Sequence, residues 1–410
     1  MNPVTPPTAL RIANEVAAIA NRLAADPPPR PDHAQSLADG AAGIALFHIE
    51  RALAGTGGWD TAHRWLNLAV RHGVLATIDS SLYRGAPAIA FAVHLSNEAH
   101  TSRYAKAQGT LDQSVTALAH HRANLAFDRI ARREPPTMAE YDIISGLTGI
   151  GAHLLRHAQD DDALHRILAY LVRLTEPIRH DGTTLPGWWT AQDPHASISP
   201  AFPGGHANLG LAHGITGPLA LLSHAKQRGI VVDGHLDAIE RICDWLDTWR
   251  QDHDTGPWWP QWVTHRDHRT GRPTQAVPLR PSWCYGTPGI ARAQQLAGLA
   301  TGDTNRRHLA EQALVSCLAD PRQLQQISDV SLCHGWAGLL LTTWRTATHA
   351  ATPKITEHLP HLTDQLLHHI AAEPLSDGLL EGHAGVALTL SAIAHGELPI
   401  SGWDTCLLIT

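Results

Sequence analysis

A short Gly-x-x-Gly frame recurs along this chain, and it constrains the fold more than any other feature. One copy is degenerate, because Gly85-Ala86-Pro87-Ala88 lacks the second glycine. The first glycines of neighbouring copies are 45 to 72 residues apart (85−40 and 286−214). Repeats of this length are typical of units that must stack on one another to bury their apolar faces. The six complete frames begin at Gly40, Gly146, Gly214, Gly286, Gly335 and Gly382.

Each frame opens a run of small and apolar residues, such as Ile44-Ala45-Leu46-Phe47 and Val386-Ala387-Leu388-Thr389-Leu390. A helix that is apolar on nearly all sides is a buried helix. Glycine at the start of the run permits a tight turn and a close backbone approach. The frames therefore predict the beginnings of buried helices.

Longer amphipathic stretches separate these runs, with apolar residues at helical spacing, as in Ile239, Ile242, Cys243 and Leu246. Seven buried helices that alternate with seven polar-faced ones predict an all-α fold, an α/α toroid with an inner and an outer ring, as one domain over 1–410. An open solenoid is the alternative, but irregular spacing favours closure. The predicted outer helices are Ala9–Ala25, Asp60–His72, Ser102–Arg129, Asp161–Ile178, Gly234–Arg250, Asn305–Asp320 and Thr356–Ala372.

Two long connections, near 177–208 and 252–282, interrupt this pattern and are rich in tryptophan, glycine and proline. Loops of this length in a compact domain are usually functional. We expect extended segments there, short strands around Trp259–His265, and a turn at Arg269-Thr270-Gly271. A small insertion within 95–140 is also predicted.

Composition narrows the function classes. A net charge of −7 leaves no electrostatic footprint for nucleic acid. The start has no basic segment followed by an apolar one, and no apolar run reaches the ~18 residues of a membrane span. An odd number of cysteines, five, favours a reducing compartment, so we expect a cytoplasmic protein.

Cys284 and Cys333 each lie two residues before the first glycine of neighbouring frames, and His334 follows Cys333. Two thiols and one imidazole suit one Zn²⁺ ion with an open fourth position. The competing interpretation is that these are small core residues, since free cysteine is often buried. Register and the added histidine favour zinc. Cys243, Cys317 and Cys406 fall elsewhere and are interpreted as structural.

Three further residues near the frames are candidates for catalysis. His213, one repeat before Cys284, is a candidate general acid or base, or else a fourth zinc ligand or a polar residue without a catalytic role. Asp142 could orient His213, but an aspartate here could equally cap a helix. Arg280 could hold an anionic group or form a structural ion pair. Arg84, Asp39 and Glu381 share the register and are interpreted as mouth-lining or capping residues.

These motifs resemble the lanthipeptide cyclase family, the lanthionine synthetase C-like proteins, in its free-standing form. The matching segments are 205–214, Trp283-Cys284-Tyr285-Gly286 and Leu332-Cys333-His334-Gly335, together with the seven repeats. The resemblance implies an α/α toroid with one zinc ion on Cys284, Cys333 and His334, and an active site that uses His213, Asp142 and Arg280.

The implied reaction is addition of a peptide cysteine thiol to dehydroalanine or dehydrobutyrine in the same dehydrated precursor peptide, which forms a thioether ring. His213 would protonate the α-carbon, and the tryptophan-rich loops would line a groove for the peptide. Implied partners are a separate dehydratase and a membrane transporter complex. Three alternatives stay open: addition of an external thiol such as glutathione, a non-catalytic zinc-containing peptide-binding scaffold, and a glycan-processing toroid, for which a convincing carboxylate pair is lacking.

Overall fold

A computed structural model describes residues 5–24, 33–97, 102–158, 162–180, 182–370 and 376–410. The chain divides into two compact units. Unit 1 comprises residues 1–115, 327–406 and 410, and unit 2 comprises residues 116–326 and 407–409. Residues 116–326, the main part of unit 2, therefore lie in sequence between the two main segments of unit 1. Each unit is described separately below.

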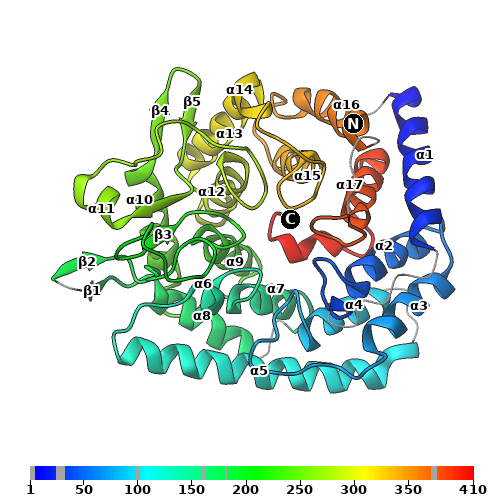
Figure 1. The fold of residues 1–410 in the computed structure, drawn as a ribbon, viewed down its shortest axis with the longest axis horizontal. Helices are drawn as coiled ribbons and strands as arrows, with labels where there is room; N and C mark the ends of the chain where they lie inside the picture. Colours follow the sequence, from blue (N-terminus) through cyan, green and yellow to red (C-terminus); the bar gives the residue numbers. More distant parts are fainter. Residues whose placement is uncertain (1–4, 25–32, 98–101, 159–161, 181, 371–375) are drawn as a thin grey trace. The chain divides into compact units, whose positions relative to one another are not determined.

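Every predicted buried helix is present and begins at its frame (Figure 1). In unit 1 these helices are α2 (Ala41–Leu53), α4 (Ala86–Asn97), α15 (Trp336–Ala347) and α17 (His383–His395). In unit 2 they are α7 (Leu147–His157), α9 (Thr216–Gln227) and α12 (Thr287–Thr301).

The polar-faced helices are also present, close to their predicted bounds. They are α1 (Pro6–Leu23), α3 (Trp59–Val70), η2 (Ser102–Tyr104) with α5 (Ala105–Ala131), α8 (Asp162–Leu174), α10 (His235–Trp249), α13 (Thr304–Ala319), and η3 (Thr356–His358) with α16 (Leu359–His369). Among the described residues, no helix combines the length and the apolar character needed to cross a membrane.

Glycine at the second position of the frame lets the preceding loop fold back onto the first turn of the helix. A Cβ added to Gly43 would lie 2.1 Å from the carbonyl oxygen of Leu37. The carbonyl group six residues before the glycine is equally close in two other frames. The oxygen of Trp283 would lie 2.3 Å from a Cβ on Gly289, and that of Leu379 would lie 1.9 Å from a Cβ on Gly385. No Cβ fits at such distances, so these positions require glycine.

Backbone hydrogen bonds join the loops of neighbouring repeats inside each unit. In unit 1, the amide of Leu37 donates to Tyr83, that of Leu380 to Ala38, and that of Cys333 to Leu380. In unit 2, the amide of Ile143 donates to Ala212, and that of Ala212 donates to Cys284. Since each residue lies just before its frame, these bonds hold the candidate site residues of one unit in a common register.

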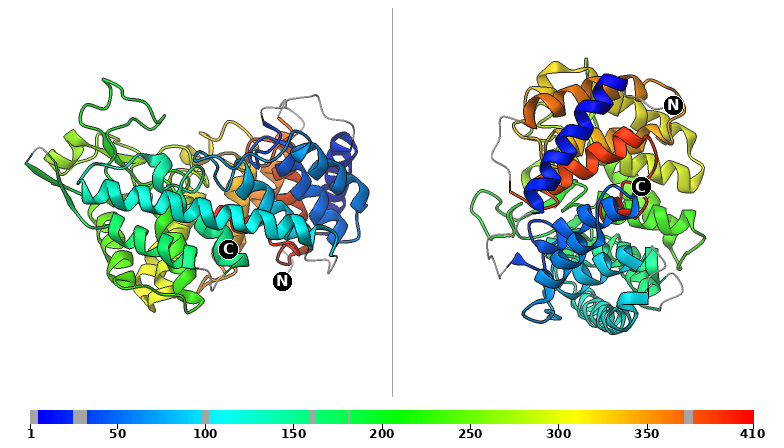
Figure 2. Two further views of the ribbon diagram at one scale, coloured as in Figure 1. Left: turned by 90° about the horizontal axis from the view of Figure 1, so that it is seen from below. Right: turned by 90° about the vertical axis from the view of Figure 1, so that its right-hand side faces the viewer.

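Unit 1 builds its core from both halves of its sequence. Helix α17 packs against α2, α15 and the N-terminal helix α1, as the two views of Figure 2 also show for α1 and α17. The carboxylate of Glu50 on α2 accepts hydrogen bonds from the amides of Ile400 and Ser401 at 2.8 and 2.9 Å. In unit 2, α9 packs between α7 and α12, and α8, α10 and α13 pack outside them.

The long connections of unit 2 contain short antiparallel strands. The pairs are β1 (Ile178–His180) with β2 (Thr183–Leu185), β3 (His206–Asn208) with β6 (Trp262–Thr264), and β4 (Gln251–His253) with β5 (Gly256–Trp258). Strand β6 lies within the predicted stretch. The predicted turn at 269–271 is instead the end of a short helix, α11 (His265–Thr270), with Gly271 in the left-handed region at its C-cap. A capping box formed by Thr264 and Asp267 starts this helix.

The expectation that the tryptophan-rich segments line a groove is wrong for four of their tryptophans. The side chains of Trp188, Trp189, Trp258 and Trp259 are at most 4% exposed. The indole N–H of Trp189 donates to the carbonyl of Gly204, and that of Trp259 to the carbonyl of Leu246. These residues anchor the loops because burial of a large aromatic ring, with its N–H bonded, stabilises an otherwise irregular segment.

The stretch 95–140 holds the end of α4, η2, the long helix α5 and the short helix α6 (Met138–Tyr141). Helix α5 begins in unit 1 and ends in unit 2. A salt bridge fastens α6 to the end of α5, because Arg129 donates to both carboxylate oxygens of Glu140. The hydroxyl of Tyr170 on α8 donates to the same carboxylate at 2.7 Å. Asp142 follows α6 directly, so this network fixes where Asp142 lies.

Candidate functional site

All the predicted site residues of unit 2 lie in or just before the turns that precede inner helices. Asp142 precedes α7, His213 precedes α9, and Cys284 precedes α12. Hydrogen bonds between the loops bring these three turns into register, because Ala212, next to His213, donates its amide to the Cys284 carbonyl. The sequence therefore correctly predicts that these turns adjoin one another within unit 2.

His213 and Asp142 are in direct contact. The Nδ1 atom of His213 lies 2.7 Å from Oδ2 of Asp142, whose side chain is 2% exposed. The other carboxylate oxygen, Oδ1, accepts the amides of Ser145 and Gly146 at 2.6 and 2.8 Å. One oxygen thus stabilises the turn that leads to Gly146, the N-cap of α7, while the other holds His213. The bonds to the turn fix the carboxylate in one orientation.

The pKa of His213 is raised above its ordinary value. Burial by itself lowers this pKa, but the hydrogen bond and the negative charge of Asp142 outweigh it, with a further contribution from Cys284. With Nδ1 engaged by Asp142, the Nε2 atom is the one left for exchange with a substrate. The pair is therefore suited to hold a proton on Nε2 and to release it.

Tyr285 belongs to the same site, although the sequence analysis assigned it no role. Its ring centroid lies 6.3 Å from that of His213. The Asn208 side-chain amide donates to the Tyr285 hydroxyl at 2.8 Å. A Cβ on Gly210 would lie 2.6 Å from the Tyr285 ring, so glycine makes room for it. The signal that could have identified Tyr285 is its register, because it occupies in its frame the position that His213 occupies in the preceding one.

A row of half-buried aromatic side chains extends from His213 along the β3–β6 ribbon. Trp262 lies edge-on to Tyr285 with centroids 6.2 Å apart, and Phe202 lies 5.8 Å from Trp262. Strand pairing sets Asn208 opposite Trp262. The two long connections thus meet beside the catalytic candidates and present an aromatic surface there. Trp262 is half-buried, in contrast to Trp258 and Trp259 of the same loop.

Cys284 is buried, with 5% of its surface exposed. The hydroxyl of Ser282 lies 3.5 Å from its Sγ atom. The indole of Trp283 anchors this turn by donating to the carbonyl of Leu407 at 3.0 Å. Gly286 then adopts a φ of 90°, a conformation that other residues rarely adopt. The turn is held rigidly from both sides of the cysteine.

Cys333 and His334 lie in unit 1, in the turn before α15, and both are half-buried. The Nε2 atom of His334 lies 3.3 Å from Oδ2 of Asp329. A carboxylate on one ring nitrogen is the usual partner of a metal-ligating histidine, because it fixes the tautomer and leaves the other nitrogen as the ligand. The local geometry of His334 therefore fits a metal ligand that would bind through Nδ1.

The remaining candidates have less specific surroundings. Arg280 is half-buried in the segment that leads to Cys284, and its carbonyl backs onto Gly286. Asp39 lies in unit 1 and is hydrogen-bonded to His33. Cys243, Cys317 and Cys406 are all buried. Burial raises the pKa of Cys243 and of Cys406 to about 12, as expected for unreactive core thiols.

Comparisons with known proteins agree with this arrangement. The model of the lanthionine synthetase C-like protein family matches residues 31–408. The nisin biosynthesis protein NisC of Lactococcus lactis subsp. lactis is 26% identical over 339 residues, which cover 81% of this chain and 78% of that protein. The solved structure of nisin cyclase superposes with a TM-score of 0.78 at 23% identity, covering 97% of this chain and 96% of the other. This likeness confirms the predicted fold class, an α/α toroid.

Proposed function

Since the chain belongs to the lanthionine synthetase C-like family, we propose that it is a zinc-dependent lanthipeptide cyclase. Its substrate would be a dehydrated precursor peptide, delivered by a separate dehydratase. The observation that carries the proposal is the His213–Asp142 pair, with Tyr285 beside it, in turns that adjoin the turn of Cys284. A proton donor is what addition of a thiol to a dehydroamino acid needs at the α-carbon.

Cys284, Cys333 and His334 are the residues that would hold the metal, because two thiols and one imidazole form a donor set that could hold a metal ion. The His334–Asp329 contact supports this assignment. Zinc bound there would lower the pKa of a coordinated thiol, which supplies thiolate at neutral pH.

In the reaction, a carbon–sulfur bond forms between the peptide thiolate and the β-carbon of dehydroalanine or dehydrobutyrine. The carbon–carbon double bond becomes single, and its electron pair moves to the α-carbon. His213 donates the proton from Nε2 to that carbon, while Asp142 holds Nδ1 and stabilises the charged imidazole. The thiol proton goes to solvent, so the product is an isomer of the substrate.

The aromatic row Tyr285–Trp262–Phe202 would contact the peptide during this step. Half-buried aromatic rings bind extended peptides through their faces and lose little conformational entropy. Arg280, in the segment before Cys284, would hold the negative charge that develops on the peptide carbonyl. With these two assignments, the proposed site contacts the peptide backbone and side chains as well as the reacting atoms.

The test uses a synthetic peptide with one dehydroalanine and one cysteine. Cyclisation leaves the mass unchanged but removes the free thiol, so the product resists alkylation by N-ethylmaleimide, which mass spectrometry reads directly. We expect one zinc per chain by elemental analysis, and we expect Cys284→Ala to lose both zinc and cyclisation. Full zinc content together with full cyclisation in that variant would sink the zinc assignment.

The same assay separates the alternatives. Glutathione added to the reaction would give a product heavier by one glutathione if the chain adds external thiols. A peptide that binds but keeps its free thiol would identify a non-catalytic scaffold. We do not expect a scaffold, because Asp142 maintains His213 as a proton donor. We expect cyclisation rather than addition of glutathione, because the chain is similar in fold to nisin cyclase.

A further inference from the structure

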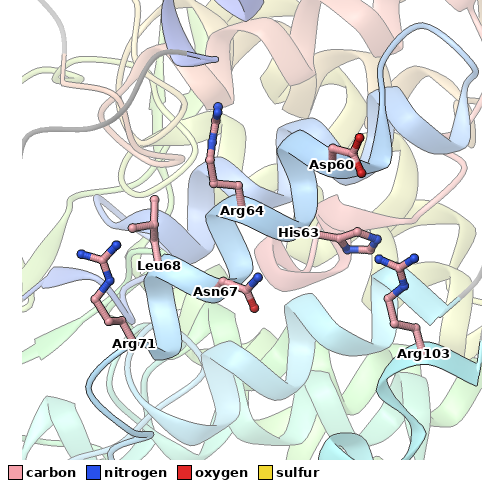
Figure 3. A pocket seen from close by; sticks show the side chains of 7 residues that line it. All are labelled: Asp60, His63, Arg64, Asn67, Leu68, Arg71 and Arg103. Atoms are coloured by element: carbon pink, nitrogen blue, oxygen red, sulfur yellow. The ribbon is translucent and has the colours of Figure 1, made fainter.

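A pocket lies in unit 1, on the outward side of α3 (Figure 3). Its volume is about 340 Å³, at the lower end of the range for ligand sites. Six of its seven lining residues come from α3 and its C-cap at helical spacing, and Arg103 of η2 completes it. Those six are Asp60, His63, Arg64, Asn67, Leu68 and Arg71.

The spacing of these residues makes them one face of the helix. The opposite face, which includes Ala62, Trp65 and Leu66, is buried in the core. The lining face is polar, and three arginines stand against one aspartate. This local excess of positive charge occurs in a chain whose net charge is −7. Among the residues that the structure describes, neither Arg71 nor Arg103 forms an ion pair.

A hydrogen bond to Nδ1 of His63 leaves the Nε2–H group of this residue as a further donor in the pocket. The hydroxyl of Tyr104 lies 2.6 Å from Nδ1 of His63. Burial raises the pKa of Tyr104, while burial and the charge of Arg103 lower the pKa of His63. At neutral pH the hydroxyl therefore donates to Nδ1, and the ring proton is on Nε2. Figure 3 shows the imidazole of His63 and the guanidinium of Arg103 turned toward one another.

We propose that this pocket binds a carboxylate side chain of the peptide substrate, a recognition site on unit 1 separate from the catalytic residues of unit 2. Planar guanidinium groups match carboxylates with paired hydrogen bonds. Asn67 and His63 Nε2 add neutral donors, and Leu68 contacts the methylene groups of an aspartate or glutamate. The small volume and the single aspartate favour one or two side chains over a long polyanion. The proposal rests on the proposed function only in naming the peptide as the ligand.

The test measures binding without catalysis. The probe is a fluorescein-labelled nonapeptide of glycine, serine and four glutamates, without cysteine or dehydroamino acids, and its twin carries glutamine at the four positions. Fluorescence anisotropy with the full chain should show at least tenfold tighter binding of the glutamate peptide. The double variant Arg71→Gln/Arg103→Gln should weaken that binding about tenfold, the effect of losing a charged hydrogen bond. Higher salt should weaken it as well, because both arginines are exposed.

Matched variants keep the result interpretable. Arg11→Gln, an exposed arginine of α1, should leave binding unchanged. Arg71→Lys/Arg103→Lys should recover only part of the binding that the double glutamine variant loses, because lysine keeps the charge but not the paired hydrogen bonds. Equal affinity for both peptides, or an undiminished affinity in the double glutamine variant, would overturn the proposal. So would displacement of the peptide by micromolar inorganic phosphate, which would identify the pocket as a phosphate site. Cys284→Ala should bind the probe normally, so failure of the zinc assignment and failure of this pocket give different results.

Discussion

At the scale of single residues, the two oxygens of the Asp142 carboxylate have different roles. Oδ1 stabilises the turn before α7, and Oδ2 contacts His213. Asp142→Asn keeps an oxygen to accept the amides of Ser145 and Gly146, but it removes the charge that faces His213. We expect the cyclisation rate to fall about a hundredfold, the usual range for an impaired general acid. The thermal midpoint and the zinc content should stay close to those of the parent chain.

Asp142→Ala provides the comparison, because it also removes the hydrogen bonds to the amides of Ser145 and Gly146. It should therefore destabilise unit 2 by about 1 kcal/mol, the net value of a typical hydrogen bond. Asp303→Asn is the matched control. Asp303 caps α13 by accepting the amide of Arg306 and lies outside the site. A normal cyclisation rate in Asp142→Asn would contradict the role assigned to the pair.

At the scale of elements, the Arg129–Glu140 salt bridge holds the short helix α6 in place. Asp142 follows α6 directly, so the position of this helix determines where Asp142 meets His213. Glu140→Gln leaves the guanidinium of Arg129, which is 8% exposed, without its counter-ion. We expect a loss of about 3 kcal/mol in the free energy of unfolding, measured by urea denaturation. Cyclisation should slow as well, because Asp142 loses its support.

Two comparisons test whether the buried charge is the cause. The double variant Arg129→Met/Glu140→Gln should recover part of the stability, since no charge is left unpaired. Glu134→Gln breaks the exposed ion pair with Arg132 and should cost at most ~0.5 kcal/mol. Equal losses in Glu140→Gln and Glu134→Gln would show that the bridge does not matter to α6.

The helices were predictable from sequence, but the connections between them were not. Glycine frames and helical periodicity locate both sets of helices because those patterns report burial directly. The loops depend on distant partners. The indole N–H groups of Trp189 and Trp259 can be buried because the carbonyl groups of Gly204 and Leu246 accept their hydrogen bonds. No local sequence pattern reveals these partners. Likewise, Cys284, Cys333 and His334 could be named as candidate metal ligands from their residue types and register. The hydrogen bond of Asn208 to Tyr285 joins residues 77 positions apart, so no local pattern predicts it.

At the scale of the whole molecule, each unit contains a buried histidine that should stay neutral in the folded state. Burial lowers the pKa of His48 in unit 1 and of His206 in unit 2 to about 4. An unfolded chain binds these protons near pH 6.5, so acid favours the unfolded state. The stabilising contribution is complete above pH 6.5 and is lost as the pH falls toward 4, by about 3 kcal/mol for each histidine.

The measurement is the urea midpoint at pH 7.0 and at pH 4.5. It should fall on acidification, and the fall should be smaller in His48→Gln and in His206→Gln. His72→Gln alters an exposed histidine and should leave the pH dependence unchanged. An identical acid response in the parent chain and in both buried-site variants would rule out these histidines as its source.

Because most of unit 2 lies in sequence between the two main segments of unit 1, unit 1 cannot be completed until unit 2 has been synthesised on the ribosome. Helix α2 emerges early, yet α17, which packs against it, follows only after residues 116–326. Translation of that intervening stretch takes roughly 10–40 s at ordinary elongation speeds. During this interval the apolar surface of α2 lacks its native contact with α17, while the helices of unit 2 can already pack against one another. Nascent chains stalled before residue 327 should therefore recruit a holdase chaperone through residues 41–53, and the released full-length chain should not.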